Sequence, residues 1–172
     1  MKYFFFLMIV ALFSCETPEK EAFDVNWTKN NSSELNKNLA IQEGINIKLF
    51  LEMRKDWTLT QTGSGLQYFI YEHGEKDTLI HPSKGNIAEI EYEVKLLDGT
   101  VVSKTEIDEY EEFKVDNSDI ESGVQEAVKK LTKGDRAKLI IPSHIGHGLI
   151  GDLNKIPPLT TLVMDIYLLG IK

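Results

Sequence analysis

The 172 residues carry a net charge of −8, and 42% of them are hydrophobic. This apolar share suffices for one domain with a buried core plus an extension, whereas 27% charged residues exclude a multi-span membrane protein. The acidic balance also argues against a nucleic-acid partner, because phosphate binding needs clustered Lys and Arg.

The first residues have the pattern of a secretory signal. Lys2 precedes an apolar stretch from Phe4 to Phe13, which is shorter than the about 20 residues of a membrane-spanning helix. The following Ser14-Cys15 completes a sequence that resembles the bacterial lipobox. This resemblance implies a signal peptide at residues 1–14, a lipid on Cys15 and a location in the cell envelope, anchored to a membrane facing the periplasm. An ordinary signal peptide with a chance cysteine is the alternative.

A polar segment and a helix are expected next. Residues 15–32 lack periodicity, which predicts a flexible tether. A helix is predicted from about residue 33 to 55, inside an N-terminal helical segment at 33–61, with Ser32 or Ser33 as its cap. The prediction rests on apolar residues every four positions: Ile41, Ile45, Leu49 and Met53. Two interpretations stay open, since this face either packs on its own domain or binds a partner or a second copy.

The remainder of the chain has the pattern of an antiparallel sheet with one short helix. Apolar and polar residues alternate with a period of two, which predicts strands. The strands are expected near residues 66–71, 89–96, 101–102, 113–115, 136–141 and 161–168. A helix is predicted from about 119 to 131, capped by Ser118 or Asp119 and ended by Gly134. These elements define an α+β fold in which the helix crosses the apolar face of the sheet.

Several motifs within residues 62–172 follow the order of one known family. They are Thr62–Tyr68 (TGSGLQY), Gly85–Tyr92 (GNIAEIEY), Leu97–Val102 (LDGTVV), Lys133–Pro142 (KGDRAKLIIP) and Ile156–Ile166 (IPPLTTLVMDI). In this order they resemble the FKBP-type peptidyl-prolyl cis-trans isomerase domain. The resemblance implies an FKBP-like curved antiparallel sheet wrapped on one short helix. The N-terminal helix followed by Asp56-Trp57 also resembles FKBP lipoproteins associated with gliding motility.

The resemblance implies an enzyme that accelerates rotation about Xaa-Pro bonds. Rotation breaks amide resonance and crosses about 18–20 kcal/mol, so the site has to favour the twisted amide. Such a site needs no nucleophile, cofactor or metal. The implied catalytic residues are Tyr92, Phe113 and His147. The implied substrate-binding residues are Val102, Ser103, Ile120, Val124 and Met164.

Several of these positions depart from the family pattern. Val102 and Val124 stand where the family usually has aromatic residues. Met164 stands at another position where an aromatic residue is common. Ser103 replaces an aspartate and His147 a tyrosine. Because aromatic walls supply much of the contact area in such a pocket, we expect weak isomerase activity. Without the resemblance, the same apolar residues would be interpreted as ordinary core.

The expected partners are proline-containing unfolded or exported polypeptides, the membrane through Cys15, and a second copy or partner protein through the 33–55 helix. The alternative functions are a non-catalytic FKBP-fold chaperone and a subunit of an envelope machine for gliding motility or secretion. His144 and His147 lack a supporting cysteine or carboxylate cluster, so no metal site is expected. The acidic run at 106–112 is expected to be a solvated loop beside the pocket that biases substrate charge.

Overall fold

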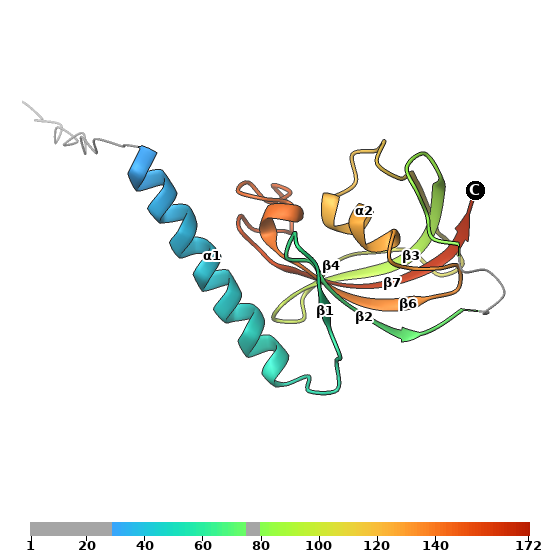
Figure 1. Ribbon diagram of the computed structural model, residues 1–172, viewed down its shortest axis with the longest axis horizontal. Helices are drawn as coiled ribbons and strands as arrows, with labels where there is room; N and C mark the ends of the chain where they lie inside the picture. Colours follow the sequence, from blue (N-terminus) through green and yellow to red (C-terminus); the bar gives the residue numbers. More distant parts are fainter. Residues whose placement is uncertain (1–28, 75–79) are drawn as a thin grey trace, which may run out of the picture.

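The computed structural model describes residues 29–74 and 80–172 (Figure 1). The predicted signal peptide, Cys15 and the tether up to residue 28 lie outside these residues. The elements follow one another as α1 (Lys29–Glu52), β1 (Thr60–Gln61), β2 (Gln67–Glu72), β3 (Ile87–Leu96), β4 (Val101–Lys104), β5 (Glu111–Lys114), α2 (Ser122–Val128), β6 (Arg136–Ile141), the 3-10 turn η1 (Ser143–Ile145) and β7 (Leu162–Ile171).

The strands form one curved antiparallel sheet, and the predicted α+β class is confirmed. Its order is β1-β2-β6-β7-β3-β4, and β5 also pairs with β3. β4 and β5 follow each other along the same edge of β3, because β4 pairs with residues 93–95 and β5 with residues 87–90. The sheet wraps around α2, which lies across its concave face (Figure 1).

The main core fills the space between α2 and the concave face. Alternate residues of a strand share a face, so the apolar set of each long strand lies on this side. The fully buried members include Ile90, Leu139, Ile166 and Leu168 from the sheet and Val128 and Leu131 from α2 and the turn after it. At about 25 cal/mol per Å² of apolar surface removed from water, this layer is the main stabilising contribution to the domain.

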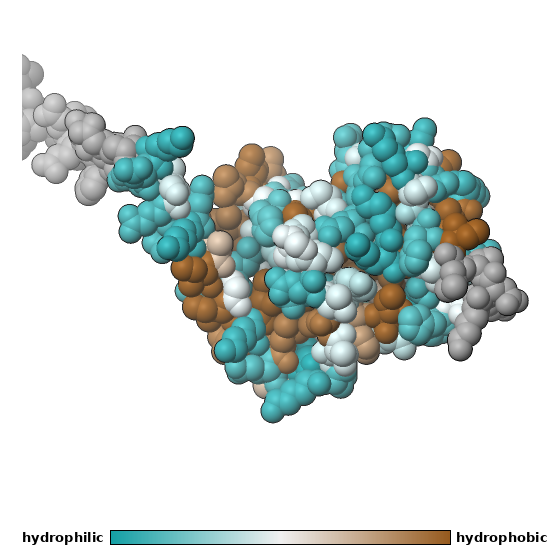
Figure 2. Space-filling model, in the orientation of Figure 1, coloured by the Kyte–Doolittle hydropathy of each residue, from teal (hydrophilic) through white to brown (hydrophobic). Residues whose placement is uncertain are grey.

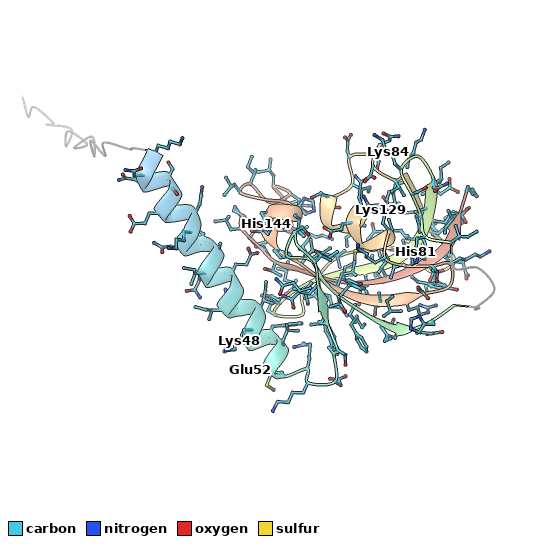
Figure 3. All side chains as sticks on the ribbon, in the orientation of Figure 1. Lys48, Glu52, His81, Lys84, Lys129 and His144 are labelled. Carbon is cyan, nitrogen blue, oxygen red and sulfur yellow. The ribbon has the colours of Figure 1, made fainter. Side chains whose placement is uncertain are left out.

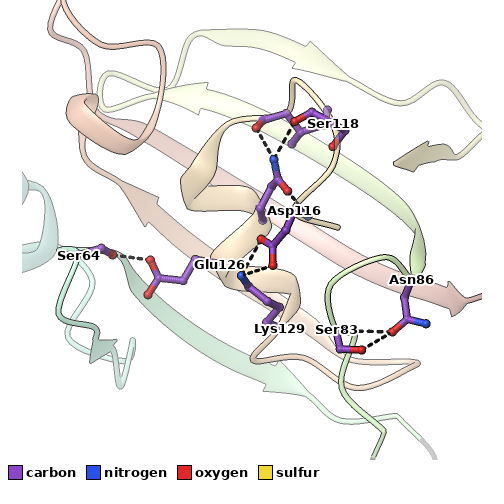
Figure 4. Close-up of polar contacts among 9 residues, drawn as sticks. Ser64, Ser83, Asn86, Asp116, Ser118, Glu126 and Lys129 are labelled. Carbon is purple, nitrogen blue, oxygen red and sulfur yellow. Dashed lines mark hydrogen bonds and ion pairs between the residues drawn. The ribbon is translucent and has the colours of Figure 1, made fainter. Parts of the chain in front are cut away.

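Polar contacts join α2 and the residue after it to the loop at residues 116–120 (Figure 4). The Gln125 side chain donates to the carbonyls of Ser118 and Ile120 at 3.1 and 2.9 Å and accepts from the Asp116 N–H at 2.5 Å. Lys129 pairs with the Asp116 carboxylate at 2.8 Å. These contacts hold the loop before α2 without extending the helix.

A second apolar cluster joins α1 to the outer face of the sheet. Ile140 and Val163, which are 0% and 8% exposed, are covered by the last turns of α1 and the segment after it. The covering residues are Ile47, Phe50, Leu51, Trp57 and Leu59. Arg54 lies over the Phe50 ring at 3.5 Å and donates to the Phe50 carbonyl at 2.9 Å. The interpretation that this helix packs on its own domain therefore holds for its C-terminal half.

The opposite side of α1 remains exposed. Ile41, Ile45, Leu49 and Met53, the residues spaced four apart, are 52%, 47%, 56% and 85% exposed. Figure 2 shows apolar surface along α1 as well as over the loop that follows η1. The labelled Lys48 and Glu52 lie near the C-terminal end of the helix (Figure 3).

Several predicted boundaries are wrong. α1 begins at Lys29, so residues 29–32 are helical and Ser32 and Ser33 lie inside the helix; no Gly or Pro stops the helix in this stretch. α2 spans only Ser122–Val128, and its N-cap is Glu121, which makes no capping side-chain hydrogen bond. Glu111 and Glu112 belong to β5, so the acidic run is loop only up to residue 110.

Candidate active site

A cavity of about 260 Å³ lies between the concave face, α2 and the loop that joins η1 to β7. Its lining residues come from distant parts of the sequence: Ile90, Tyr92, Val94, Val102, Ser103, Glu111, Ile120, Glu121, Val124, Ile141, His147, Asp152, Ile156, Leu162 and Met164. Most of these side chains are apolar and the charged ones are few, which is the usual composition of a small-ligand pocket.

The apolar lining is part of the main core. Ile90, Tyr92 and Val94 share one face of β3 because they are two residues apart, and Leu162 and Met164 do the same on β7. Val102 and Val124 are each 5% exposed, and Met164 is 3% exposed. The pocket is therefore a place where the core is accessible to a small apolar group.

Tyr92 is the aromatic residue of this wall. Its side chain is half-buried and its hydroxyl lies 3.3 Å from Ser103 Oγ. Burial is the main reason why the pKa of the Tyr92 phenol is raised above its ordinary value of 10, and a hydrogen bond from the phenol to Glu111 adds to it, while the Ser103 hydroxyl acts in the other direction. Burial and the bond to Glu111 both favour the protonated phenol, whose single proton is donated to Glu111 in this structure.

A polar rim surrounds the apolar lining. His147 Nε2 lies 2.7 Å from Glu121 Oε1, and both side chains are about one quarter exposed, at 29% and 26%. This contact joins the loop after η1 to the residue that precedes α2. Glu111 and Asp152 also line the pocket, so the rim contains three carboxylates and one histidine.

The loop that carries His147 has a defined conformation. Asp152 Oδ1 accepts hydrogen bonds from the N–H groups of Ile156 and Asn154 at 2.6 and 2.9 Å, and these bonds, Ile156 first, hold the pKa of Asp152 below its ordinary value. Gly151 has φ of 72°, and a Cβ there would lie 2.1 Å from the Ile156 carbonyl oxygen. A side chain at this position is therefore excluded, and the loop forms a fixed wall.

The structure brings most of the sequence-predicted site residues together. Seven of the eight line this one cavity: Tyr92, Val102, Ser103, Ile120, Val124, His147 and Met164. Phe113 is not among the lining residues. It pairs with Ala88, four residues before Tyr92 on β3, and its side chain is 5% exposed within the main core. The Phe113 side chain therefore lies in the core and not in the lining of this cavity, where it was expected.

Sequence reasoning missed other lining residues. Ile90 and Val94 could have been found from their spacing of two from Tyr92, and Ile156 from its position in the Ile-Pro-Pro motif. Glu121 and Asp152 carried no such signal, because their place at the rim depends on the path of two loops.

A larger hollow of about 600 Å³ lies elsewhere, between α1 and the edge of the domain. Its apolar side chains include Leu149 and Leu159, which are 67% and 37% exposed. A small apolar ring loses more of its water-exposed surface in a cavity with a mostly buried apolar lining than in a wide exposed groove, and this burial stabilises its binding. The smaller cavity is therefore the candidate active site.

Within residues 29–74 and 80–172, no group of three His, Cys, Asp or Glu side chains is placed to hold a metal ion. Across the same ranges, no helix combines the length and apolar character that crossing a membrane requires. The arrangement offers an apolar surface for a ring and a few hydrogen-bonding groups around it.

Comparisons with known proteins agree with this arrangement. The family model described as FKBP-type peptidyl-prolyl cis-trans isomerase matches residues 79–169. FK506-binding protein 1 from Yarrowia lipolytica is 37% identical over 98 residues, covering 56% of this chain and 90% of that one. The chain therefore belongs to the family of FKBP-type peptidyl-prolyl cis-trans isomerases.

Within this family the chain is similar to a group of bacterial proteins. FkpA from Buchnera aphidicola (subsp. Schizaphis graminum) is 34% identical over 157 residues, which cover 89% of this chain and 56% of that protein. The crystal structure of FkpA from Escherichia coli superposes with a TM-score of 0.66 at 26% identity, covering 83% of this chain and 64% of that one. The chain thus spans about half the length of these curated relatives, 56% and 54% for the proteins from Buchnera and Escherichia coli K12.

Proposed function

We propose that this protein accelerates cis–trans isomerisation of Xaa-Pro bonds in exported polypeptides and that the prolyl ring enters the cavity lined by Tyr92. One observation supports this most directly. An accessible apolar cavity occurs in the family domain, and Tyr92, Val102, Val124 and Met164 line it together.

The chemistry of such a site is preferential binding of the twisted amide. A planar amide has a polar, resonance-stabilised carbonyl, whereas the twisted form has lost that resonance and carries less separated charge. An apolar surround therefore disfavours the planar forms more than the twisted form, which lowers the barrier. The Tyr92 hydroxyl is suited to exchange its hydrogen bond to Glu111 for one to the substrate backbone, which would limit the motion of the substrate.

The small side chains at positions 102 and 124 set the expected strength of this activity. Both are valines, so the walls offer less contact area than aromatic rings would. The ring is held less tightly, and we expect slow turnover.

The test is a protease-free assay of a short Xaa-Pro peptide. Tyr92→Ala removes the aromatic wall and should lower kcat/KM by about tenfold, equivalent to about 1.4 kcal/mol. Tyr92→Phe, which removes only the hydroxyl, should retain more activity. Phe113→Ala should lower stability at least as much as activity, since Phe113 lies in the core. Wild-type rates equal to those in buffer would rule out the enzymatic proposal.

We also propose that the protein is a lipoprotein of the cell envelope, modified on Cys15 and facing the periplasm. The lipobox-like sequence at residues 12–15 supports this. More than one acyl chain is needed for stable anchoring. Metabolic labelling with a fatty acid should mark the wild type and leave Cys15→Ala unlabelled. Equal labelling of both proteins would exclude this site.

The exposed side of α1 favours a second function. Its apolar residues Ile41, Ile45, Leu49 and Met53 make a patch that could join a second copy or attach the domain to an envelope machine, including one for gliding motility or secretion. A non-catalytic chaperone would use the same surfaces. Light scattering distinguishes self-association from the other two cases, because it measures the mass of the protein in solution. A dimer that Ile45→Glu converts to a monomer, while the neighbouring Lys48→Glu does not, supports self-association.

A further inference from the structure

Glu43 of α1 binds the loop that forms one wall of the pocket. Its Oε1 accepts hydrogen bonds from the Ser143 N–H at 2.7 Å and from the Thr161 hydroxyl at 2.6 Å, and its Oε2 accepts from the Ser143 hydroxyl at 3.1 Å. These partners are 100 and 118 residues away in sequence. Ser143 and Thr161 are both buried, at 5% and 3% exposed.

The two partners of Glu43 are the two ends of one loop. Ser143 begins η1 just after β6, and Thr161 immediately precedes β7. Between them lie His147, Asp152 and Ile156, all of which line the pocket. One carboxylate therefore holds together both ends of the segment that supplies these three side chains.

The same contacts join the pocket wall to the helix. Figure 3 places His144, the residue after Ser143, on the side of the domain that α1 passes, and this residue lines the same hollow as Glu43. The loop also has internal bonds, for example from the Leu159 N–H to the Gly148 carbonyl at 2.9 Å. These internal bonds keep its shape, whereas Glu43 fixes its position relative to α1.

We propose that Glu43 is a positioning residue, through which the docking of α1 sets the placement of the pocket wall and thereby substrate affinity. This inference rests on the proposed isomerase function. Hydrogen bonds to a charged group are stronger than neutral ones, and buried donors that lose their partner shift towards water. Loss of the carboxylate therefore displaces the loop ends and, with them, His147 and Ile156.

The test compares Glu43→Ala and Glu43→Gln with the control Glu52→Gln, all in the full chain. Glu52 is an exposed residue of the same helix. Glu43→Ala should raise KM for an Xaa-Pro peptide by about threefold to tenfold with a smaller change in kcat. Amide hydrogen exchange in residues 143–161 should accelerate in the same variant. Glu43→Gln, which keeps an acceptor oxygen, should restore part of both properties, and Glu52→Gln should match the wild type.

A second variant covers the case in which Glu43→Ala does not fold. Thr161→Val removes one donor with almost no change in shape and should produce a smaller rise in KM and in exchange of the loop. In the double variant with Glu43→Gln, the effects should be less than additive, because Glu43→Gln weakens and Thr161→Val removes the same hydrogen bond. Unchanged KM and unchanged loop exchange, despite a lower melting temperature, would overturn the proposal. If the wild type has no isomerase activity, the exchange measurement still decides whether Glu43 holds the loop.

Discussion

At the residue scale, the lining of the pocket divides into a polar rim with charged side chains and an apolar remainder. Glu111, Glu121 and Asp152 line the cavity together with a single histidine, His147. In the proposed binding mode, the apolar lining receives the prolyl ring, which is common to all substrates. The carboxylates are then placed to contact the residues beside the proline and to distinguish one client sequence from another.

This arrangement predicts a preference for basic residues next to proline. An Xaa-Pro peptide with Lys before proline should have a kcat/KM about threefold to tenfold higher than the norleucine peptide at low ionic strength, and Glu should be the poorest residue. For each variant, kcat/KM for the Lys peptide is divided by kcat/KM for the norleucine peptide, and this ratio should fall towards one in Glu111→Gln. Glu112→Gln is the matched control, since Glu112 contacts Lys172 at 2.7 Å and does not line the pocket. A Lys advantage that does not decrease with added salt would contradict this explanation.

The family motifs, and not the residue types alone, indicated which residues would share a pocket. Tyr92, Val102 and Met164 line one cavity, and regular strands carry them. Phe113 lies outside this cavity, since an apolar residue on a neighbouring strand can face another part of the core. Phe113 pairs with Ala88 and not with Tyr92, and this register places its side chain away from the cavity. The pairing register of two strands cannot be derived from a single sequence.

At the element scale, the turn between α2 and β6 depends on Asp135. This side chain is 2% exposed and accepts hydrogen bonds from the Thr132 N–H at 2.7 Å, the Thr132 hydroxyl at 3.0 Å and the Gly74 N–H at 3.0 Å. Burial would raise the pKa of Asp135, but these bonds outweigh it and hold the pKa below its ordinary value. The carboxylate thus connects the turn to the chain after β2.

The pKa of Asp135 makes a prediction about acid stability. Since the folded-state pKa is depressed, the contribution of Asp135 is complete above the unfolded pKa of about 3.9 and is lost as pH falls through the folded value. Asp135→Asn should lower the free energy of unfolding at pH 7 by about 1–3 kcal/mol, because it replaces an acceptor of three bonds. Urea denaturation at pH 7 and pH 3 checks this. The difference between variant and wild type should shrink at pH 3, and a constant difference would exclude the ionised form as its cause.

The outer face of the sheet carries two apolar residues. Ile140 and Val163 alternate with residues of the concave face, so they lie on the opposite face, and both are buried beneath α1. Alternation predicted their direction correctly, and their apolar character indicated a covering element. Which side of α1 covers them could not be predicted, because the apolar residues spaced every four positions lie on the exposed side of the helix. The residues that pack, Ile47, Phe50 and Leu51, lie on the other side of the helix.

At the scale of the whole molecule, α1 and the domain form one folded unit through this outer cluster. Ile47→Asp places a charge against Ile140 and Val163 and should lower the free energy of unfolding by about 2–5 kcal/mol. Ile45→Asp, two residues away on the exposed side, should have little effect. Thermal and urea unfolding of the two variants provide the comparison. Equal destabilisation by both would show that the change in helix propensity, and not the packing against the sheet, is responsible.

The edges of the sheet are short on both sides. On one side, β1 covers only the start of β2 and is itself two residues long. On the other, the edge consists of β4 and β5, two separate strands of four residues each. Among the described residues, the sheet edges therefore offer an extended segment no long row of free backbone groups on which to add as a further strand. If the protein acts on unfolded chains as proposed, such short edges would keep it from becoming the seed of their aggregation.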